Sequence, residues 1–461
     1  MRPRSGPVAA LVLLVLSLAA AGCSDPPTQT ARPASTPTAT PTPGPAATPA
    51  STPTATPTPG PAARLAPAPT PEESIESALA EYIPWYGDPP YPLAVAPIRE
   101  LWHRDAELGR AVAQAPWIAD GLDHWEEDAV YGLQYLFDHD PALARRVLAY
   151  TLDEPVRSRD TLLPATLGRM SREHRDTFKL LIGQTWFADG LDAEERAFIV
   201  AVSHTTGVDG LYRGLLAERF SRSGAISLPL AGEVTLWAFS NDAPPTGEVL
   251  ALAQRAVRGA EGIMGAPFPL DDLIILSLDV DGYDIAYGGV NWGDSVVLLR
   301  GERLLERDYG ELLYHEIAHY WLPGEIGPFW LYEGGANMVA AYLLAGGRPL
   351  EVDENMVSYC RDHGVPDIHA VEVPDHPDPV AQSTCCYLFG QYFLTTLFHT
   401  VGEAAFSSAM RELYEAYASY EPPATDEQVY RVFLGHTPPD RRAAFLDAYR
   451  RLHGGPFLPV R

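Results

Sequence analysis

The sequence predicts an α+β protein in which an all-helical repeat domain precedes a domain with a small sheet and many helices. Three observations predict this class. Apolar residues at three- and four-residue spacing run from Glu72 to about Phe220, as in ALARRVLAYTL. Alternating stretches such as ISLPLAGEVTLWAFS begin after Ser221. Helical patterns then continue to the end of the chain, and a few strands followed by helices is the order typical of α+β domains.

The amino terminus carries a targeting signal and a spacer. Residues 1–22 read as a signal peptide, because an apolar run from Val8 to Ala21 follows two arginines and is too short to span a bilayer. The junction LAAAGCS resembles a bacterial lipoprotein cleavage site, which predicts a membrane lipid anchor on Cys23. The alternative is an ordinary signal peptide and a secreted protein. Residues 23–71 are rich in Pro, Thr and Ala and predict a disordered tether. Both interpretations place the protein outside the cytoplasm.

The charge of the chain bears on its partners. The formal net charge is -27 over 461 residues, and clusters of Lys and Arg are absent from the sequence. Because binding to phosphates needs such clusters, we expect no nucleic-acid partner.

Three cysteines follow Cys23, namely Cys360, Cys385 and Cys386. In an extracytoplasmic protein, one interpretation is a disulfide from Cys360 to one member of the adjacent pair. The other interpretation is three buried thiols.

The region 72–220 contains two stretches of similar sequence. PWIADGLDHWEEDAVYGL and TWFADGLDAEERAFIVAV share the pattern W-x-A-D-G-L-D followed by acidic residues and an apolar helix. In each copy the first Asp-Gly (Asp120, Asp189) is predicted to end a helix, and the second Asp (Asp123, Asp192) to cap the next one. A helical repeat of this kind is either a structural scaffold or a surface for a substrate or partner.

The region 221–461 is predicted to form one mixed domain. We expect strands over ISLPLAGEVTLWAFS, DLIILSLDV and SVVLLRG, with a helix over GEVLALAQRAVRGAEGIMG. The turn DVDGYD has acidic spacing, but its Gly comes too early for an EF-hand, which favours a plain hairpin turn. Five helices are expected after the last strand, over YHEIAHYW, WLYEGGANMVAAYLLAG, YLFGQYFLTTLFHTV, EAAFSSAMRELYEAY and PPDRRAAFLDAYRRLH.

The stretch YHEIAHYW contains the candidate metal ligands. On a helix, His315 and His319 lie one turn apart on the same face with Glu316 beside them, which is the spacing of two imidazoles on one metal ion. The preceding Asp308 and Glu311 are a candidate capping pair for this helix. A catalytic zinc also needs a third ligand, and Glu333 supplies one from the next helix. The alternative is an amphipathic surface helix whose polar face happens to be His, Glu and His.

HExxH followed by W-L-x-E-G-x-A resembles the gluzincin metallopeptidases, especially the alanyl aminopeptidase-like and bacterial peptidase MA-like groups. The resemblance implies a thermolysin-like zincin catalytic domain and one zinc ion bound by His315, His319 and Glu333. It also implies that Glu316 is the general base. The stretch between His319 and Glu333 is shorter here than in the aminopeptidases.

Upstream, GGVNWG resembles the family's substrate-binding edge strand, which implies that Gly288, Gly289 and Asn291 bind a peptide in extended form. The family's glutamate for a free amino terminus is missing between Val290 and Asn291. Endopeptidase and aminopeptidase activities therefore both stay open.

Downstream, CCYLFGQYFLTTL resembles the family's Y-x-x-G helix, whose tyrosine stabilises the oxyanion, and this implies that role for Tyr387. The alternatives are a core tyrosine or the same role for Tyr392. Asn337 lies one turn after Glu333 and is a candidate to orient a zinc-bound imidazole, or else a solvated helix residue.

These features together predict an extracytoplasmic zinc metallopeptidase that hydrolyses peptide bonds of a peptide or protein by Glu-assisted attack of zinc-bound water. The competing hypothesis is a noncatalytic surface lipoprotein whose helical region binds a partner and whose zinc site is structural or vestigial. A fourth ligand from the loop HAVEVPDHPDP would favour that hypothesis, because structural zinc sites are closed by four protein ligands.

Overall fold

The computed structural model describes residues 75–83, 95–118, 124–152, 162–189, 192–203, 205, 220–240, 246–279, 289–291, 295–300, 306–348, 350, 354–371, 379–417 and 423–454. The predicted signal peptide, the tether, Cys23, Gly288 and most of the DVDGYD turn lie outside these residues. No helix among the described residues has both the length and the apolar character needed to cross a membrane.

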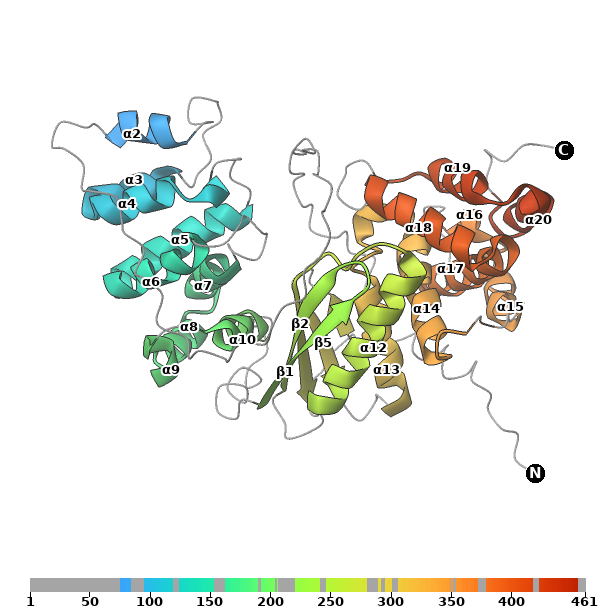
Figure 1. Cartoon of the computed structure of the whole chain (residues 1–461), viewed down its shortest axis with the longest axis horizontal. Helices are drawn as coiled ribbons and strands as arrows, with labels where there is room; N and C mark the ends of the chain where they lie inside the picture. The colour runs from blue at the N-terminus through green and yellow to red at the C-terminus, as the bar shows by residue number, and fades with distance from the viewer. Residues whose placement is uncertain are drawn as a thin grey trace, which may run out of the picture. The chain divides into compact units, whose positions relative to one another are not determined.

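The chain divides into two compact units between Gly190 and Leu191. The described elements of the first unit are all helical (Figure 1): α2 (Ile75–Tyr82), α3 (Val95–Arg104), α4 (Ala106–Ala113), η1 (Pro116–Ile118), α5 (His124–His139), α6 (Pro141–Leu152), α7 (Leu162–Glu173), α8 (Arg175–Ile182) and α9 (Thr185–Asp189). Helices α5 and α7 approach closely at a pair of glycines, since a Cβ on Gly168 would lie 2.8 Å from Gly132 Cα.

The second copy of the W-x-A-D-G-L-D pattern forms the predicted helix break. Helix α9 ends at Asp189, and α10 (Ala193–Ser203) follows. Asp192 Oδ1 accepts from the Glu195 N–H at 2.8 Å, and the Glu195 carboxylate accepts from the Asp192 N–H at 3.0 Å. This reciprocal cap confirms the expectation for Asp192. Asp120 and Asp123 of the first copy lie outside the described residues.

Helix α10 belongs to the second unit, whereas the sequence pattern predicted the domain boundary between residues 220 and 221. The rings of Phe198 on α10 and Phe239 on β2 lie 5.4 Å apart. The helix therefore packs on the sheet that follows it, and its helical periodicity alone does not reveal this association.

A five-stranded sheet forms the centre of the second unit, in the order β1-β2-β3-β5-β4. The strands β2, β3 and β5 are parallel, and β1 and β4 are antiparallel edge strands. The first alternating pattern of the sequence is a hairpin whose turn is held by buried Glu261, which accepts from the N–H groups of Leu230 and Ala231. The strands are β1 (Phe220–Leu228), β2 (Gly232–Ser240), β3 (Asp272–Asp279), β4 (Gly289–Asn291) and β5 (Ser295–Arg300).

Helices cover the sheet. On one face α12 (Thr246–Met264) packs against β1 and β2, while α13 (Glu306–Ala318) packs against β4, β5 and α12 (Figure 1). Helix α10 contacts β2 and β3, and its Phe198 ring lies beside that of Phe239 on β2. Helix α13 begins at Glu306, so the prediction that Asp308 and Glu311 cap its amino terminus is wrong, because both lie inside the helix.

The remaining elements are helical: η2 (Gly324–Ile326), α14 (Phe329–Leu344), α15 (Glu354–Asp362), α16 (Ile368–Val371), α17 (Pro379–Val401), α18 (Glu403–Tyr417), α19 (Asp426–His436), η3 (Pro439–Arg441) and α20 (Arg442–Leu452). A disulfide joins Cys360 on α15 to Cys385 on α17, and Cys386 is buried outside it. The small sheet followed by helices confirms the α+β class in its general form.

Helices α14 and α17 meet at glycines. A Cβ on Gly390 would lie 2.3 Å from the Trp330 carbonyl oxygen, and a Cβ on Gly334 would lie 2.4 Å from Gly390 Cα. Only glycine permits this approach. The contact fixes the distance between the two helices next to Glu333 and Tyr387.

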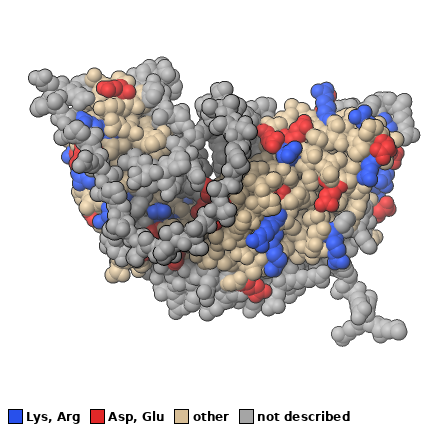
Figure 2. Space-filling model, viewed as in Figure 1, with Lys and Arg blue, Asp and Glu red and all other residues tan. Residues whose placement is uncertain are grey.

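The surface charges of the described residues are mixed. On the face shown in Figure 2, Lys and Arg side chains are interspersed with Asp and Glu. The expectation of no nucleic-acid partner stays a prediction.

Candidate metal centre

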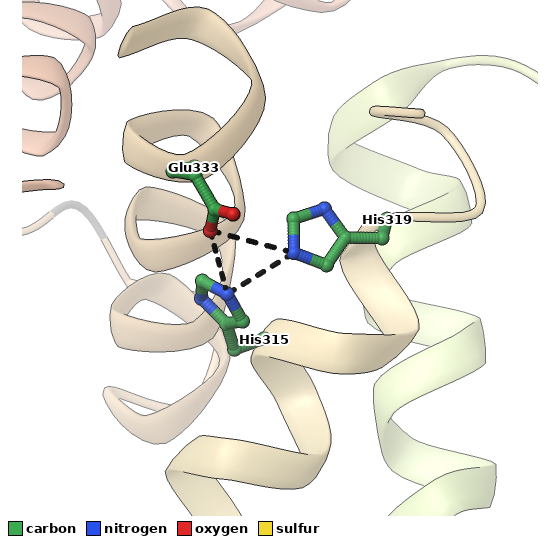
Figure 3. Close-up of side chains that lie close together, drawn as sticks. All are labelled: His315, His319 and Glu333. Atoms are coloured by element: carbon green, nitrogen blue, oxygen red, sulfur yellow. Dashed lines mark hydrogen bonds and ion pairs between the residues drawn. The ribbon is translucent and has the colours of Figure 1, made fainter. Parts of the chain in front are cut away.

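Three side chains from two helices converge at the predicted metal site (Figure 3). His315 and His319 come from the end of α13 and the turn after it, and Glu333 comes from the second turn of α14. The two Nε2 atoms are 3.1 Å apart. Glu333 Oε2 lies 3.2 Å from His315 Nε2 and 3.6 Å from His319 Nε2. Among the described residues this is the one such group of three, and it contains no fourth ligand.

The polar face of α13 is buried along with its apolar face. His315 is 3% exposed, Glu316 4% and His319 7%, while Ile317 on the opposite side is fully buried. The alternative of an amphipathic surface helix is therefore wrong, since a solvated polar face would expose these groups. Burying three ionisable side chains costs free energy unless they are paired or bind an ion.

The hydrogen bonds at the Nδ1 atoms of His315 and His319 determine whether the Nε2 atoms present a lone pair or a proton to the site. His319 Nδ1 lies 3.1 Å from the Leu322 carbonyl oxygen, which can only accept, so Nδ1 carries a proton. His315 Nδ1 lies 2.8 Å from Asn337 Oδ1 and is assigned the same role. In the neutral rings, both Nε2 atoms then present lone pairs to each other and to a carboxylate oxygen. Three acceptors this close together require either a proton on one of them or a metal ion among them.

The spacing of these donor atoms fits zinc. Ligands at about 2.0–2.1 Å from a tetrahedral zinc ion lie about 3.4 Å from one another. The three separations of 3.1, 3.2 and 3.6 Å are distributed around that value. Two imidazoles and one carboxylate also form a donor set used by catalytic zinc sites, which keep a position open for water.

The electrostatics of the metal-free site favour a bound cation. Burial would raise the pKa of Glu333, but hydrogen bonding to His315, the two imidazoles and the Tyr387 hydroxyl hold this pKa below its usual range. Burial lowers the pKa of His319 to about 4, so this ring is neutral. The pKa of His315 is raised despite burial, chiefly by its hydrogen bond to Glu333. A proton on His315 thus competes with a metal ion for the same place.

Glu316 lies beside the metal ligands with its carboxyl group against β4. A Cβ on Gly289 would lie 3.0 Å from Glu316 Oε1. Burial and the charge of Glu333 raise the pKa of Glu316 to about 7 in the metal-free site, against His315 and a hydrogen bond from the Asn291 backbone N–H. A carboxyl group with a pKa in this range can both accept and return a proton near neutral pH.

Tyr387 adjoins the same site from α17. Its ring is stacked with that of His315, with centroids 6.2 Å apart, and its hydroxyl is hydrogen-bonded to Glu333. Burial, followed by the nearby carboxylates, raises the pKa of Tyr387 well above its usual range, so the hydroxyl stays protonated and remains a donor. Tyr392 instead interacts with Glu354 and does not join the site.

The sequence did not single out two aromatic residues of the site. The ring of Tyr332 lies 4.3 Å from that of His319, and the ring of Phe329 lies 6.0 Å from that of Tyr387. Both side chains are partly exposed. Their position in FWLYE, within the four residues before the metal ligand Glu333, was the feature of the sequence that could have indicated them.

The predicted residues thus gather with few exceptions. Around His315, His319, Glu316 and Glu333 lie four more of the predicted residues, namely Asn337, Tyr387, Gly289 and Asn291. Gly288 and most of the loop HAVEVPDHPDP lie outside the described residues.

No protein-family model matches the chain, and no curated protein matches it. Among solved structures, it is similar to an M1 zinc metallopeptidase from Deinococcus radiodurans, with 17% identity and a TM-score of 0.39, over 52% of this chain and 54% of that one. It is also similar to a mutant two-domain M1 zinc metallopeptidase bound to L-arginine, with 15% identity and a TM-score of 0.38, over 52% and 53%. The chain thus spans about half the length of these structures.

Proposed function

We propose that this protein is a zinc-dependent peptidase. The observation that carries the proposal is the convergence of three buried lone-pair donors, those of His315, His319 and Glu333, next to a carboxyl group and a protonated phenol. The signal-like amino terminus supports an extracytoplasmic site of action, with an anchor on Cys23 or as a secreted protein.

Each residue of the site has a task that suits its chemistry. His315, His319 and Glu333 would hold the zinc ion, and Asn337 would orient the His315 ring. When bound, zinc would supply Lewis acidity and lower the pKa of water at the site. Glu316 would accept a proton from the attacking water and transfer it to the leaving amine. The Tyr387 hydroxyl would donate to the carbonyl oxygen as negative charge develops there.

The substrate proposed is a peptide in extended form. Strand β4 is an edge of the sheet and lies against Glu316, so a peptide that pairs with β4 would bring a carbonyl group to the site. Between Val290 and Asn291 this chain lacks the glutamate with which the resembling family binds a free amino terminus. We therefore favour an endopeptidase over a strict aminopeptidase.

One experiment tests this function. The purified protein, with its metal content measured, is incubated with a peptide library in two forms, one with free and one with acetylated amino termini. Cleavage of both forms by a protein with one zinc ion is the expected result. Cleavage of free termini alone would contradict the endopeptidase assignment. Zinc without cleavage would overturn the peptidase proposal and favour the noncatalytic lipoprotein.

A further inference from the structure

Glu316 is contacted at its main chain by a side chain of β4. The Nδ2 of Asn291 donates to the Glu316 carbonyl oxygen at 2.7 Å. In a continued helix this carbonyl would accept from the N–H of Tyr320, but that N–H donates to the Ile317 carbonyl at 3.2 Å. The Glu316 carbonyl is thus one of the last carbonyl groups of α13, which need partners from outside the helix. Asn291 supplies this partner.

The carboxyl end of Glu316 is contacted by the same strand. The backbone N–H of Asn291 is hydrogen-bonded to the carboxyl group. Gly289 leaves the space in which this group lies, since a Cβ there would be 3.0 Å from Glu316 Oε1 and 3.1 Å from Cγ. Because side chains alternate along a strand, Gly289 and Asn291 face α13 together.

We infer that Asn291 is a positioning residue for Glu316, which holds the proposed general base through its main chain while the β4 backbone holds its carboxyl group. This inference rests on the proposed function. Its consequence is a direct connection between the edge strand and the base: a peptide that pairs with β4 binds the strand that fixes Glu316. Loss of the side-chain contact should allow the last turn of α13 to move and displace the carboxyl group.

The kinetic test uses two variants and a control. Asn291→Ala removes the amide, and Asn291→Asp keeps its shape but replaces the donor with an acceptor that faces a carbonyl oxygen. Because a misplacement of about 1 Å costs about 100-fold in rate, we expect kcat to fall about 10- to 100-fold in both variants, with KM within about threefold and zinc content unchanged. Asn355→Ala, which removes an exposed amide on α15, should leave kcat unchanged. If either Asn291 variant folds and retains its kcat, the inference is wrong.

A double-mutant cycle separates positioning from general damage. If Asn291 acts through Glu316, Asn291→Ala should add less than about threefold to the loss already caused by Glu316→Gln. An additive loss in the double variant would overturn the inference. Should Asn291→Ala fail to fold, Asn291→Asp takes its place in the cycle.

A crystallographic readout does not depend on activity. In the metal-free Asn291→Asp protein, the Glu316 carboxyl group should leave its position beside Gly289, whereas the His315, His319 and Glu333 side chains should stay in place. An unmoved carboxyl group would refute the inference. If the wild-type protein cleaves no peptide, the proposed function fails, and this structural comparison still decides whether Asn291 positions Glu316.

Discussion

The close contact between α14 and α17 makes Gly390→Ala a demanding test of the structure. The new methyl carbon would lie 2.3 Å from the Trp330 carbonyl oxygen and 2.8 Å from Gly334 Cα. Separations under 3.0 Å essentially never occur for real Cβ atoms, so the helices must part by at least about 0.7 Å. Both atoms that are met belong to the main chain and cannot rotate away.

The size of the effect follows from that rigidity. Overpacking of a core costs about 1–3 kcal/mol, and a main-chain clash belongs at the upper end of this range. For a domain of this size, about 3 kcal/mol corresponds to a fall in Tm of roughly 6–12 °C. Separation of the helices should also weaken the hydrogen bond between Glu333 and Tyr387, and with it the affinity for zinc.

Thermal unfolding and zinc titration are the assays, and Gly262→Ala is the matched control. Gly262 is an exposed residue of α12, and a Cβ there would have no neighbour within 4 Å. This substitution should raise stability by roughly 0.5–1 kcal/mol, as expected for Gly to Ala in a helix. Equal melting temperatures for Gly390→Ala and the wild type would refute the predicted helix contact.

Three further predictions concern single side chains. Glu316→Gln should bind zinc as the wild type does and lose about 10²–10⁴-fold in kcat, and a variant that keeps most of its activity would exclude a base role. Tyr387→Phe should lose about 10²–10³-fold in kcat with unchanged zinc content, whereas an unchanged rate would exclude the oxyanion role. Burial would raise the pKa of Asp426, but hydrogen bonds from His453 and Trp330 lower it. This carboxylate therefore stabilises the fold above the pKa that it has in the unfolded chain, and the stabilisation is lost as pH falls through its pKa in the folded protein. Asp426→Asn should therefore lower the free energy of unfolding by about 1–2 kcal/mol at pH 7, and by less below about pH 4. Chemical denaturation of the variant and the wild type under both conditions measures this loss. An equal loss under both conditions would show that this reasoning is wrong.

The metal-ligand group could be predicted from the sequence because its spacing is local. His315 and His319 are four residues apart, and a helix brings residues at that spacing to one face. Glu333 follows after a short connection, which limits where the next helix can run. The capping role of Asp192 was also predictable, since both partners of the cap lie within one turn.

Contacts between distant segments could not be predicted in the same way. Asn291 and Glu316 are separated by a strand and part of a helix, and no periodicity records that the amide of one meets the carbonyl of the other. The pairing of Cys360 with Cys385 rather than Cys386 likewise depends on how α15 and α17 pack. The helical periodicity of α10 looks the same whether the helix packs on other helices or on the sheet.

The measurement that tests the central claim most directly is zinc content together with cleavage, before and after removal of the metal from the purified protein. One zinc ion per chain is predicted, with cleavage of an acetylated peptide that is lost on chelation and restored by added zinc. A Glu333→Gln variant should bind zinc more weakly under the same conditions. Undiminished cleavage by the chelated protein, or failure of the purified protein to bind zinc at all, would contradict the account.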